Sequence, residues 1–377
     1  MAMNSALVSK VCSKKEMQSF IDFPHALFKN DINYVPELFI AQRDLLTPGK
    51  HPFHEHSKIQ LFFAHRNGKM VGRIAAILNN NHNSFNKKSD GFFGFFDCEE
   101  DEVVAKLLFD EVKKCLKEQG ANTLIGPVNF STNETCGLLV EGHDSAPVIM
   151  MTYNPSYYLK LIEGYGFQKK TDLIAYAFGE QGYDDKPFRL MDMLMERLKQ
   201  RNISIRKVSL KNFSEEAKNI REVYNSAWDK NLGFVPMTNN EFDYLAKDMK
   251  MLLDPDFCLV AEKEEKIIGF ALAVPDINQI LINIRKGRLL PLGIFKLLFN
   301  KKKINGLRII ALGVTSEYRK LGIEACFYGC IIKSYRAKGF KKAEASWILE
   351  DNYLMNKALL QINGVPYKRY RIFEKAI

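Results

Sequence analysis

The sequence predicts an α/β fold, layered in the α+β manner, in which two mixed-sheet domains follow in tandem with helices on both faces of each sheet. Its 377 residues are enough for two domains of about 180 residues each. The hydrophobic fraction of 46% and the charged fraction of 26% are typical of a globular protein. The third observation is internal similarity between two segments almost 200 residues apart.

The first repeated element is a strand–turn–strand unit. Residues 62–72 read FFAHRNGKMVG and residues 259–269 read LVAEKEEKIIG, so that Gly72 corresponds to Gly269 at an offset of 197. Apolar alternation on each side of a short polar stretch predicts a β-hairpin in each half.

The second repeated element is a helix followed by a strand. Residues 154–167 (NPSYYLKLIEGYGF) align with residues 352–365 (NYLMNKALLQINGV) at an offset of 198. We expect an Asn N-cap to open each helix, Asn154 in the first half and Asn352 in the second, and a glycine to close it.

Between these landmarks each half contains a long amphipathic helix with a strand on either side. The helix of the first half ends at Gly120 and that of the second at Gly339. Their apolar faces comprise Val104, Leu107, Leu108, Val112, Cys115 and Leu116 in the first half, and Ile323, Phe327, Cys330, Ile331 and Tyr335 in the second. The flanking strands are Phe92–Phe96 and Thr123–Gly126 in the first half, and Leu307–Val314 and Lys342–Ile348 in the second. Hairpins combined with strand–helix–strand crossovers predict a mixed sheet.

The two predicted domains meet at a polar, glycine-rich stretch at residues 179–187, which precedes a helix at Phe188–Arg201. We therefore place the first domain at residues 1–180 and the second at residues 181–377. Each half has one insertion, at residues 127–147 and at about residues 275–305.

Charge and histidine are unevenly distributed. Residues 1–180 contain 19 Lys+Arg and 21 Asp+Glu, whereas residues 181–377 contain 35 and 23. The basic second half favours an anionic ligand such as a nucleotide, an RNA or an acidic membrane, although solubility alone also explains it. All seven histidines lie at or before His143, so chemistry in the second half must use other groups.

The composition also indicates a compartment. No apolar run reaches the ~20 residues that a membrane-spanning helix needs. The first residues contain no apolar signal segment, and the seven cysteines form no CxxC pair. We therefore expect a cytoplasmic protein in a reducing environment.

The segment Leu312–Phe327 is the strongest candidate for ligand chemistry. A strand ends at Val314 and a helix begins near Leu321, with Arg319 and Lys320 in the turn between them. Unpaired N–H groups and the positive end of the helix dipole make such a turn a candidate anion site.

The order of elements and the turn Arg319-Lys320-Leu321-Gly322-Ile323 resemble the GNAT superfamily of acyl-CoA-dependent acyltransferases, whose turn reads R/Q-x-x-G-x-G/A. The resemblance covers nearly all of residues 203–377. Residues 59–178 are similar to a second, degenerate copy, as in tandem GNAT proteins.

The resemblance implies an acyl-CoA donor, acetyl-CoA or a longer thioester, and no metal. It implies that the turn binds the coenzyme A diphosphate and that the strand end pairs with the pantetheine arm, while Asn352 lies near the thioester. The implied donor-binding residues are Leu312, Gly313, Val314, Arg319, Lys320, Leu321, Gly322, Ile323 and Asn352.

Acyl transfer to an amine requires a base, for which Glu350 and Asp351 are the candidates at the end of a predicted strand. Both are also explained as charges at a helix N-terminus. The resemblance implies acceptor contacts between the first two helices of the second half, at Asn225, Trp228, Asn231 and Phe234. These four residues are equally explained as ordinary loop and core positions. The acceptor itself, a small-molecule or protein amine, is left open.

The chain departs from the GNAT pattern in three places. Glu324 replaces the last small residue of the turn, and Leu360 stands where many members have a tyrosine acid. In the first half the corresponding turn, Asp97–Glu102, is acidic and would repel a diphosphate. Two alternatives to an acyl-CoA-dependent N-acyltransferase follow, namely a tRNA-dependent aminoacyltransferase of the Fem type and a non-catalytic ligand-binding or scaffold protein.

The insertion at 285–303 has a basic and apolar composition. No acidic residue occurs from Ile277 to Ser316, whereas eight Lys and Arg do. This pattern fits weak contact with an anionic membrane. It fits better a helix whose residues Ile294, Leu297 and Leu298 pack on the protein inside a solvated basic rim.

One further cluster, His51–His56, brings three imidazoles together without the spacing of a strong zinc motif. A polar surface loop or a loop beside the acceptor explains it better than a metal.

Overall fold

The computed structural model describes residues 6–179, 186–227 and 233–377. Within these residues the chain divides into two compact units that are not contiguous in sequence. Unit 1 comprises residues 1–173, 278–301 and 368–377, and unit 2 comprises residues 174–277 and 302–367. The sequence places the boundary near residue 180. Units defined by contacts also assign residues 278–301 and residues 368–377, which include most of the last strand, to unit 1.

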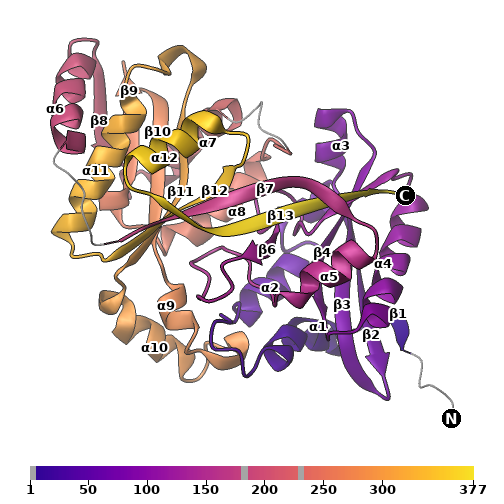
Figure 1. Cartoon of the computed structure of the whole chain (residues 1–377). Helices are drawn as coiled ribbons and strands as arrows, with labels where there is room; N and C mark the ends of the chain where they lie inside the picture. Colours follow the sequence, from indigo (N-terminus) through magenta and orange to yellow (C-terminus); the bar gives the residue numbers. More distant parts are fainter. Residues whose placement is uncertain (1–5, 180–185, 228–232) are drawn as a thin grey trace. The chain divides into compact units, whose positions relative to one another are not determined.

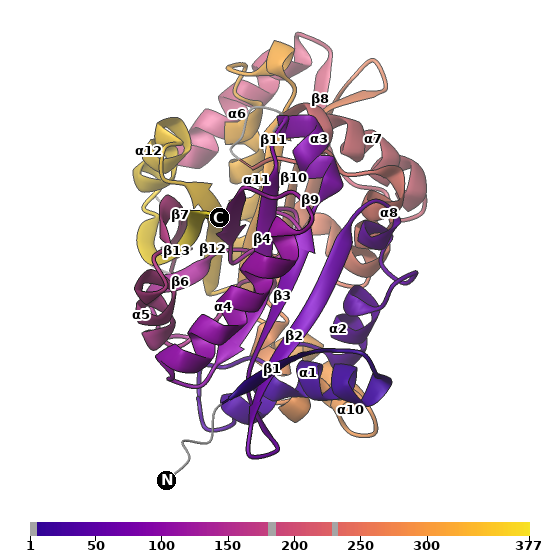
Figure 2. The same cartoon turned by 90° about the vertical axis from the view of Figure 1, so that its right-hand side faces the viewer.

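Unit 1 is built on one mixed sheet (Figure 2). Its own strands are β1 (Leu7–Lys10), β2 (Lys58–Arg66), β3 (Lys69–Leu78), β4 (Asp90–Cys98), β5 (Thr123–Gly126) and β6 (Leu138–Glu141). The order is β1-β2-β3-β4-β5, with the end of β13 (Val365–Ala376) beside β5, and β6 also pairs with β13. Strands β4 and β5 pair in parallel, and the other neighbouring strands of this sheet pair antiparallel.

The helices of unit 1 cover both faces of this sheet. They are α1 (Lys14–Leu27), α2 (Phe39–Leu46), α3 (Asn80–Asn86), α4 (Glu102–Lys117), α5 (Tyr157–Gly164), α9 (Asn278–Leu281) and α10 (Gly293–Asn300), with 3-10 turns at Pro52–Glu55 and Arg285–Gly287. Figure 2 shows α4 lying along β2–β4. Its buried residues Val104, Leu108, Val112 and Leu116 confirm the apolar face expected for this helix.

Unit 2 has the same plan. Its strands are β8 (Ile203–Lys207), β9 (Cys258–Lys263), β10 (Lys266–Pro275), β11 (Gly306–Val314) and β12 (Lys342–Leu349), in the order β12-β11-β10-β9-β8. Only β11 and β12 are parallel among these five. Strand β7 (Gln168–Phe178) and strand β13 each run from one unit into the other.

Two layers of helices enclose the sheet of unit 2. The helices are α6 (Lys186–Lys199), α7 (Phe213–Ala227), α8 (Asn239–Lys250), α11 (Ile323–Ala337) and α12 (Tyr353–Gln361), with 3-10 turns at Pro255–Phe257, Lys301–Lys303 and Ser316–Tyr318. Helices α6 and α11 pack on one face through Met191, Leu198 and Phe327. Helix α7 packs on the other face through Val223. The expected apolar face of α11 is confirmed by buried Ile323, Phe327, Ile331 and Tyr335.

The predicted hairpins are confirmed. Strands β2 and β3 pair across the turn Asn67-Gly68, and β9 and β10 pair across Glu264-Glu265. All four turn residues have positive φ, as a tight two-residue hairpin turn requires.

The expected N-cap is confirmed in one half and wrong in the other. The Asn352 side chain accepts the Met355 N–H and caps α12. Helix α5, however, begins after Ser156. The Asn154 side chain instead bonds both the N–H and the C=O of Leu139, because that backbone passes next to it.

Candidate functional site

The turn that precedes α11 is open at the helix end. Gly322 is the N-cap with φ of 90°, and α11 begins at Ile323. The first bond of the helix runs from the Cys326 N–H to the Gly322 carbonyl. The N–H groups of the three residues before Cys326 therefore have no acceptor within the helix, and the helix dipole adds positive potential there.

The two basic residues of the turn have different surroundings. Arg319 donates to the Val314 carbonyl at 3.2 Å and to the Ala227 carbonyl at 2.8 Å, so its guanidinium ties the turn to the end of α7. Lys320 is exposed and has φ of 68°. Both side chains are exposed, so both charges are accessible, and Arg319 in addition holds the turn in shape.

The other turn residues contribute backbone rather than charge. Ile323 is fully buried, and Leu321 packs on the core of unit 2. A Cβ on Gly322 would lie 2.8 Å from a methyl carbon of Leu194. The close packing and the positive φ together explain why glycine occupies this position.

Strands β11 and β12 separate directly before this turn. Their parallel register ends at Ile309 and Ala345. The register of β11 with β10, in contrast, continues from Ala311 to Val314, past a bulge at Ile310. The predicted donor-contacting backbone of Leu312, Gly313 and Val314 thus lies where β11 has parted from β12. A backbone edge of this kind can accept an extended ligand.

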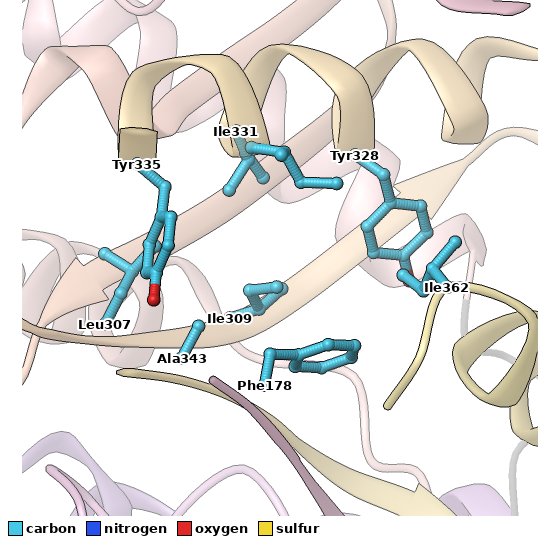
Figure 3. Close-up of a pocket in the computed structure, with 9 residues that line it drawn as sticks. Phe178, Leu307, Ile309, Tyr328, Ile331, Tyr335, Ala343 and Ile362 are labelled. Atoms are coloured by element: carbon cyan, nitrogen blue, oxygen red, sulfur yellow. The ribbon is translucent and has the colours of Figure 1, made fainter. Parts of the chain in front are cut away.

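An apolar pocket lies between α11 and the paired part of β11 and β12 (Figure 3). Figure 3 shows Tyr328, Ile331 and Tyr335 of α11 pointing toward Ile309 of β11 and Ala343 of β12. The remaining lining residues are Phe178, Leu307, Ile332 and Ile362. The lining is suited to hydrocarbon and carries two tyrosine hydroxyls.

Tyr328 lines this pocket and carries a hydroxyl that can donate a proton. Its hydroxyl donates to Met355 Sδ of α12 at 3.2 Å. Burial raises the pKa of the Tyr328 hydroxyl well above its usual range, and the Glu324 charge acts in the same direction. The group therefore stays protonated at neutral pH. Leu360, the position at which many GNAT members have a tyrosine acid, is more than half exposed, and its side chain cannot donate a proton.

Glu350 and Asp351 lie in the turn between β12 and α12, as expected. The Glu350 and Leu349 carbonyls both accept the Asn356 side-chain amide. The Tyr176 hydroxyl in turn donates to Asn356 at 2.9 Å. These bonds hold the turn beside the cap formed by Asn352. Whether either carboxylate acts as a base stays a prediction.

A buried polar cluster on the opposite face of the sheet was not predicted. Leu307 and Ala343 point into the pocket, so their neighbours Arg308 and Glu344 point to the other face. Arg308 donates to Ser346 Oγ at 3.1 Å, and Ser346 donates to Glu344. Tyr367 also donates to Glu344.

This cluster lies in the same two strands that diverge. Arg308 and Glu344 are each only 2% exposed, although each belongs to a strand of mainly apolar residues. The Arg308 guanidinium stacks over the Trp347 ring at 5.2 Å. A signal was present in the sequence, because single charges in the middle of apolar strands are costly unless paired.

The predicted acceptor residues are only partly described. The Asn225 side chain bonds the N–H and the C=O of Met237, joining α7 to the segment before α8. Phe234 is buried, with its ring 6.1 Å from that of Tyr224. Both environments are those of packed structural residues. Trp228 and Asn231 lie outside the described residues.

Unit 1 lacks the open features of unit 2. The Asp101 carboxylate caps α4 by accepting the Val103 and Val104 N–H groups. It is also paired with Arg66 at 2.7 Å. The helix N-terminus of unit 1 is thus already neutralised by its own carboxylate.

Side chains also close the corresponding strand edge in unit 1. Asn129 accepts the Phe95 N–H at 2.8 Å, and Tyr158 accepts the Cys98 N–H at 2.9 Å. Phe93 corresponds to Ile309 when both are counted from the first residue pair of the parallel strands. Phe109 corresponds to Tyr328 when both are counted back from the glycine that closes each long helix. The rings of Phe93 and Phe109 are in contact at 5.3 Å and fill the space that is a pocket in unit 2.

The histidine cluster is held by ordinary structural bonds. His51 caps the 3-10 turn by accepting the Phe53 N–H, His54 bonds the Leu45 carbonyl, and His56 bonds Ser57. In residues 6–179, 186–227 and 233–377 no group of three or more His, Cys, Asp or Glu side chains is arranged to hold a metal ion.

No protein-family model matches the chain. Two curated proteins are similar to it over almost their whole length. "Protein YghO" of Escherichia coli (strain K12) is 34% identical over 378 residues, covering 98% of this chain and 95% of that protein. "Bacterial ceramide synthase" of Caulobacter vibrioides is 32% identical over 377 residues, covering 98% of this chain and 97% of that protein.

Among solved structures, the chain is similar to a tandem GNAT protein from the clavulanic acid biosynthesis pathway. The TM-score is 0.58 with 9% sequence identity, and 99% of this chain and 98% of that chain are covered. At this identity the similarity is one of fold, which is the tandem GNAT fold predicted from the repeats.

Proposed function

The chain belongs to the family of Escherichia coli YghO and the bacterial ceramide synthase of Caulobacter vibrioides, and from this premise we propose that it is an acyl-CoA-dependent N-acyltransferase. We propose further that the acyl group is a fatty acyl chain and that the acceptor is the amine of a long-chain amino alcohol. A ceramide is the amide of these two components, and one relative carries that name.

The observation that carries the proposal is the opening between β11 and β12 beyond Ile309 and Ala345, next to the start of α11. The apolar pocket lies farther along, under the later turns of α11 and over the paired part of the two strands. The N–H groups of the first turn of α11 and Lys320 bind the diphosphate of the donor. The free edge of β11 at Leu312–Val314 pairs with the amide groups of the pantetheine arm. The aliphatic and aromatic lining of the pocket marks the place of the hydrocarbon chain. The cavity itself has room for no more than about one water molecule, so the proposal requires α11 and the strands to part when the chain binds.

The reaction forms a C–N bond and breaks the C–S bond of the thioester. The amine must lose a proton and the departing thiolate must gain one. We propose Glu344, in the buried cluster on the other face, as the base in place of Glu350 and Asp351, because its strand borders the opening. The Tyr328 hydroxyl supplies the proton to sulfur.

The positive charge of Arg308 offsets the cost of burying the Glu344 carboxylate. A buried carboxylate is costly unless it is paired or hydrogen-bonded. Ser346 links Arg308 to Glu344, and Tyr367 donates to the same carboxylate. These hydrogen bonds give the buried Glu344 carboxylate partners within the cluster.

The test is an initial-rate assay of the full chain with palmitoyl-CoA and acetyl-CoA, each offered to a long-chain 2-amino-1,3-diol, a polyamine and a lysine peptide. Thiol release and mass spectrometry of the amide report the reaction. We expect the highest kcat/KM for palmitoyl-CoA with the amino diol. Absence of amide with every pair, together with donor binding, would favour the non-catalytic alternative.

A pocket variant tests the acyl assignment separately. Ala343→Leu adds three carbons to a buried lining position. We expect the kcat/KM for palmitoyl-CoA to fall about tenfold while that for acetyl-CoA changes little, because a short acyl group does not need the filled space. Equal losses for both donors would show that the pocket does not hold the acyl chain.

A further inference from the structure

The segment around α10 exposes an unusual amount of apolar surface. Leu290, Leu292, Phe295, Leu298 and Phe299, called here the α10 patch, are between 53% and 77% exposed. The Phe295 and Phe299 rings stack at 6.3 Å, so they lie on the same side of the helix. Among the described residues this is the densest group of exposed large apolar side chains, with five in ten positions.

The expectation that this helix is covered by the protein is only half met. Ile294 and Leu297 are half-buried, but Leu298 is 65% exposed. The sequence alone could not separate these cases, because the helix has apolar residues on most of its sides.

The patch rests on a firmly attached base. Ile280, Leu281 and Ile284 are buried in unit 1. Arg288 forms a two-pronged ion pair with Asp22 of α1, with both distances 2.9 Å, and its guanidinium lies 3.7 Å from the centre of the Phe39 ring. The exposed residues are therefore presented by an ordered part of unit 1 and not by a loose tail.

Within the segment that carries the patch, the charged residues are all basic. Exposed lysines occur before, within and directly after α10, at Lys286, Lys296, Lys301, Lys302 and Lys303. No acidic residue lies between Ile277 and Ser316. Exposed apolar and aromatic side chains next to lysines match the interface of an anionic bilayer, where hydrocarbon lies below a layer of phosphate.

We propose that the α10 patch and its lysines dock unit 1 on the surface of an anionic phospholipid membrane. The contact is interfacial, since no described helix is long and apolar enough to cross a membrane. The inference goes beyond the proposed function. It gives the enzyme access to a water-insoluble amine, but the observations that carry it do not involve the opening in unit 2.

The test is co-sedimentation of the full chain with vesicles of phosphatidylcholine containing phosphatidylglycerol, and with vesicles of phosphatidylcholine alone. We expect binding to the anionic vesicles that weakens at high salt. The variant Phe295→Asp/Phe299→Asp should bind at least tenfold more weakly. A matched control, Ile32→Asp/Met251→Asp, changes two equally exposed apolar residues elsewhere and should bind as the unchanged protein does.

A second pair of variants tests the charges. Replacing Lys301, Lys302 and Lys303 by Gln should weaken binding several-fold and flatten its salt dependence. Replacing the exposed Lys15, Lys88 and Lys117 by Gln removes the same charge and should have a much smaller effect. Equal binding by the two triple variants would overturn the proposal.

Other outcomes are equally decisive. If the unchanged protein ignores anionic vesicles but forms a dimer that Phe295→Asp/Phe299→Asp abolishes, the patch is an interface between two copies and the proposal is wrong. Turnover of an amino diol dissolved in detergent reports the active site alone, and it should be the same in the patch variant. Loss of turnover in all proteins with vesicle binding retained would reject the proposed function and leave the docking surface intact.

Discussion

Glu344 is buried, hydrogen-bonded by Ser346 and Tyr367, and placed in a strand that borders the opening. We predict that Glu344→Gln lowers kcat about a hundredfold or more, in the range expected for a lost general base. The measurement is kcat and KM with palmitoyl-CoA and the amino diol. The matched variants Glu350→Gln and Asp351→Asn should retain most of kcat. The opposite pattern would return the role of base to the turn before α12.

Tyr328 gives a second prediction at the same scale. Tyr328→Phe keeps the ring in the pocket and removes only the hydroxyl that carries the proton. We expect kcat to fall tenfold or more with little change in KM, because the ring still packs on the acyl chain. A donor whose thiol leaves more easily should recover part of the loss. An unchanged kcat would exclude this hydroxyl as the acid.

His25 gives a prediction about pH and stability. Burial lowers the pKa of His25 from its usual 6.5 to about 4, and the nearby Arg73 charge acts in the same direction. Arg288 also lowers it, and Asp22 opposes the shift. The unfolded chain therefore binds a proton that the folded chain does not, so the free energy of unfolding falls as the pH drops from 6.5 toward 4.

The measurement is urea unfolding at pH 7 and pH 4.5. Comparison with His25→Asn cancels the titration of neighbours such as Asp97. The unchanged protein should lose on the order of 2 kcal/mol more than the variant between the two pH values. An equal loss in both proteins would contradict the shift.

The role of a single residue can be predicted from the sequence where its bonding partners lie close to it in the chain. Asn352 caps α12 because the donor that its side chain accepts from, the Met355 N–H, lies within its own chain segment. Asn154 occupies the matching place, yet bonds a strand fifteen residues earlier. The pairing of Arg308 with Glu344 through Ser346 depends on the register of two strands, which no local pattern specifies.

Among the elements, the segment that carries α10 depends on one glycine. Gly287 has φ of 61°, and a Cβ there would lie 1.9 Å from the Glu37 carbonyl oxygen. The obstacle is backbone and cannot move away as a side chain could. We predict that Gly287→Ala lowers the free energy of unfolding by roughly 2 kcal/mol or more, or releases residues 278–301 from unit 1.

Chemical denaturation and limited trypsin digestion at Lys296 and Lys301 measure these two effects. Gly49→Ala is the control, because Gly49 has a similar φ of 77° with open space where the Cβ would be. It should cost only the backbone strain, about 1 kcal/mol. Equal stability of the two variants would show that the contact with Glu37 is not important.

Hairpins and amphipathic helices were predictable because their signals repeat along the chain every two or about 3.6 residues. The pocket was not predictable. It results from Ile309 and Tyr328, where unit 1 has Phe93 and Phe109 in ring contact. The difference in side-chain volume lies at one of these positions, where Ile309 stands in place of Phe93, since Tyr328 is at least as large as Phe109. Apolar patterns do not record such a difference.

For the whole molecule, the two halves of the sequence predicted a tandem fold correctly, because duplicated landmarks recur at almost constant offset. The exchange of segments could not be foreseen. Residues 278–301 and 368–377 belong to unit 1, although they follow most of unit 2 in sequence. Such contacts join positions more than a hundred residues apart, for example Asp22 and Arg288.

The differences between the two units predict how many donor molecules one chain binds. Unit 1 has a capped helix, an occupied strand edge and packed rings where unit 2 has an open turn, a free edge and a pocket. One chain should therefore bind one donor, in unit 2. Lys320→Glu should weaken this binding without loss of fold, since Lys320 is exposed and glutamate tolerates a similar φ at Glu265.

Calorimetric titration of the full chain with coenzyme A is the most direct measurement of this claim. We predict one equivalent bound per chain, at least tenfold weaker binding in Lys320→Glu, and no detectable binding in Gly322→Glu. Absence of heat with the unchanged protein, two equivalents per chain, or unaltered affinity in both variants would contradict it.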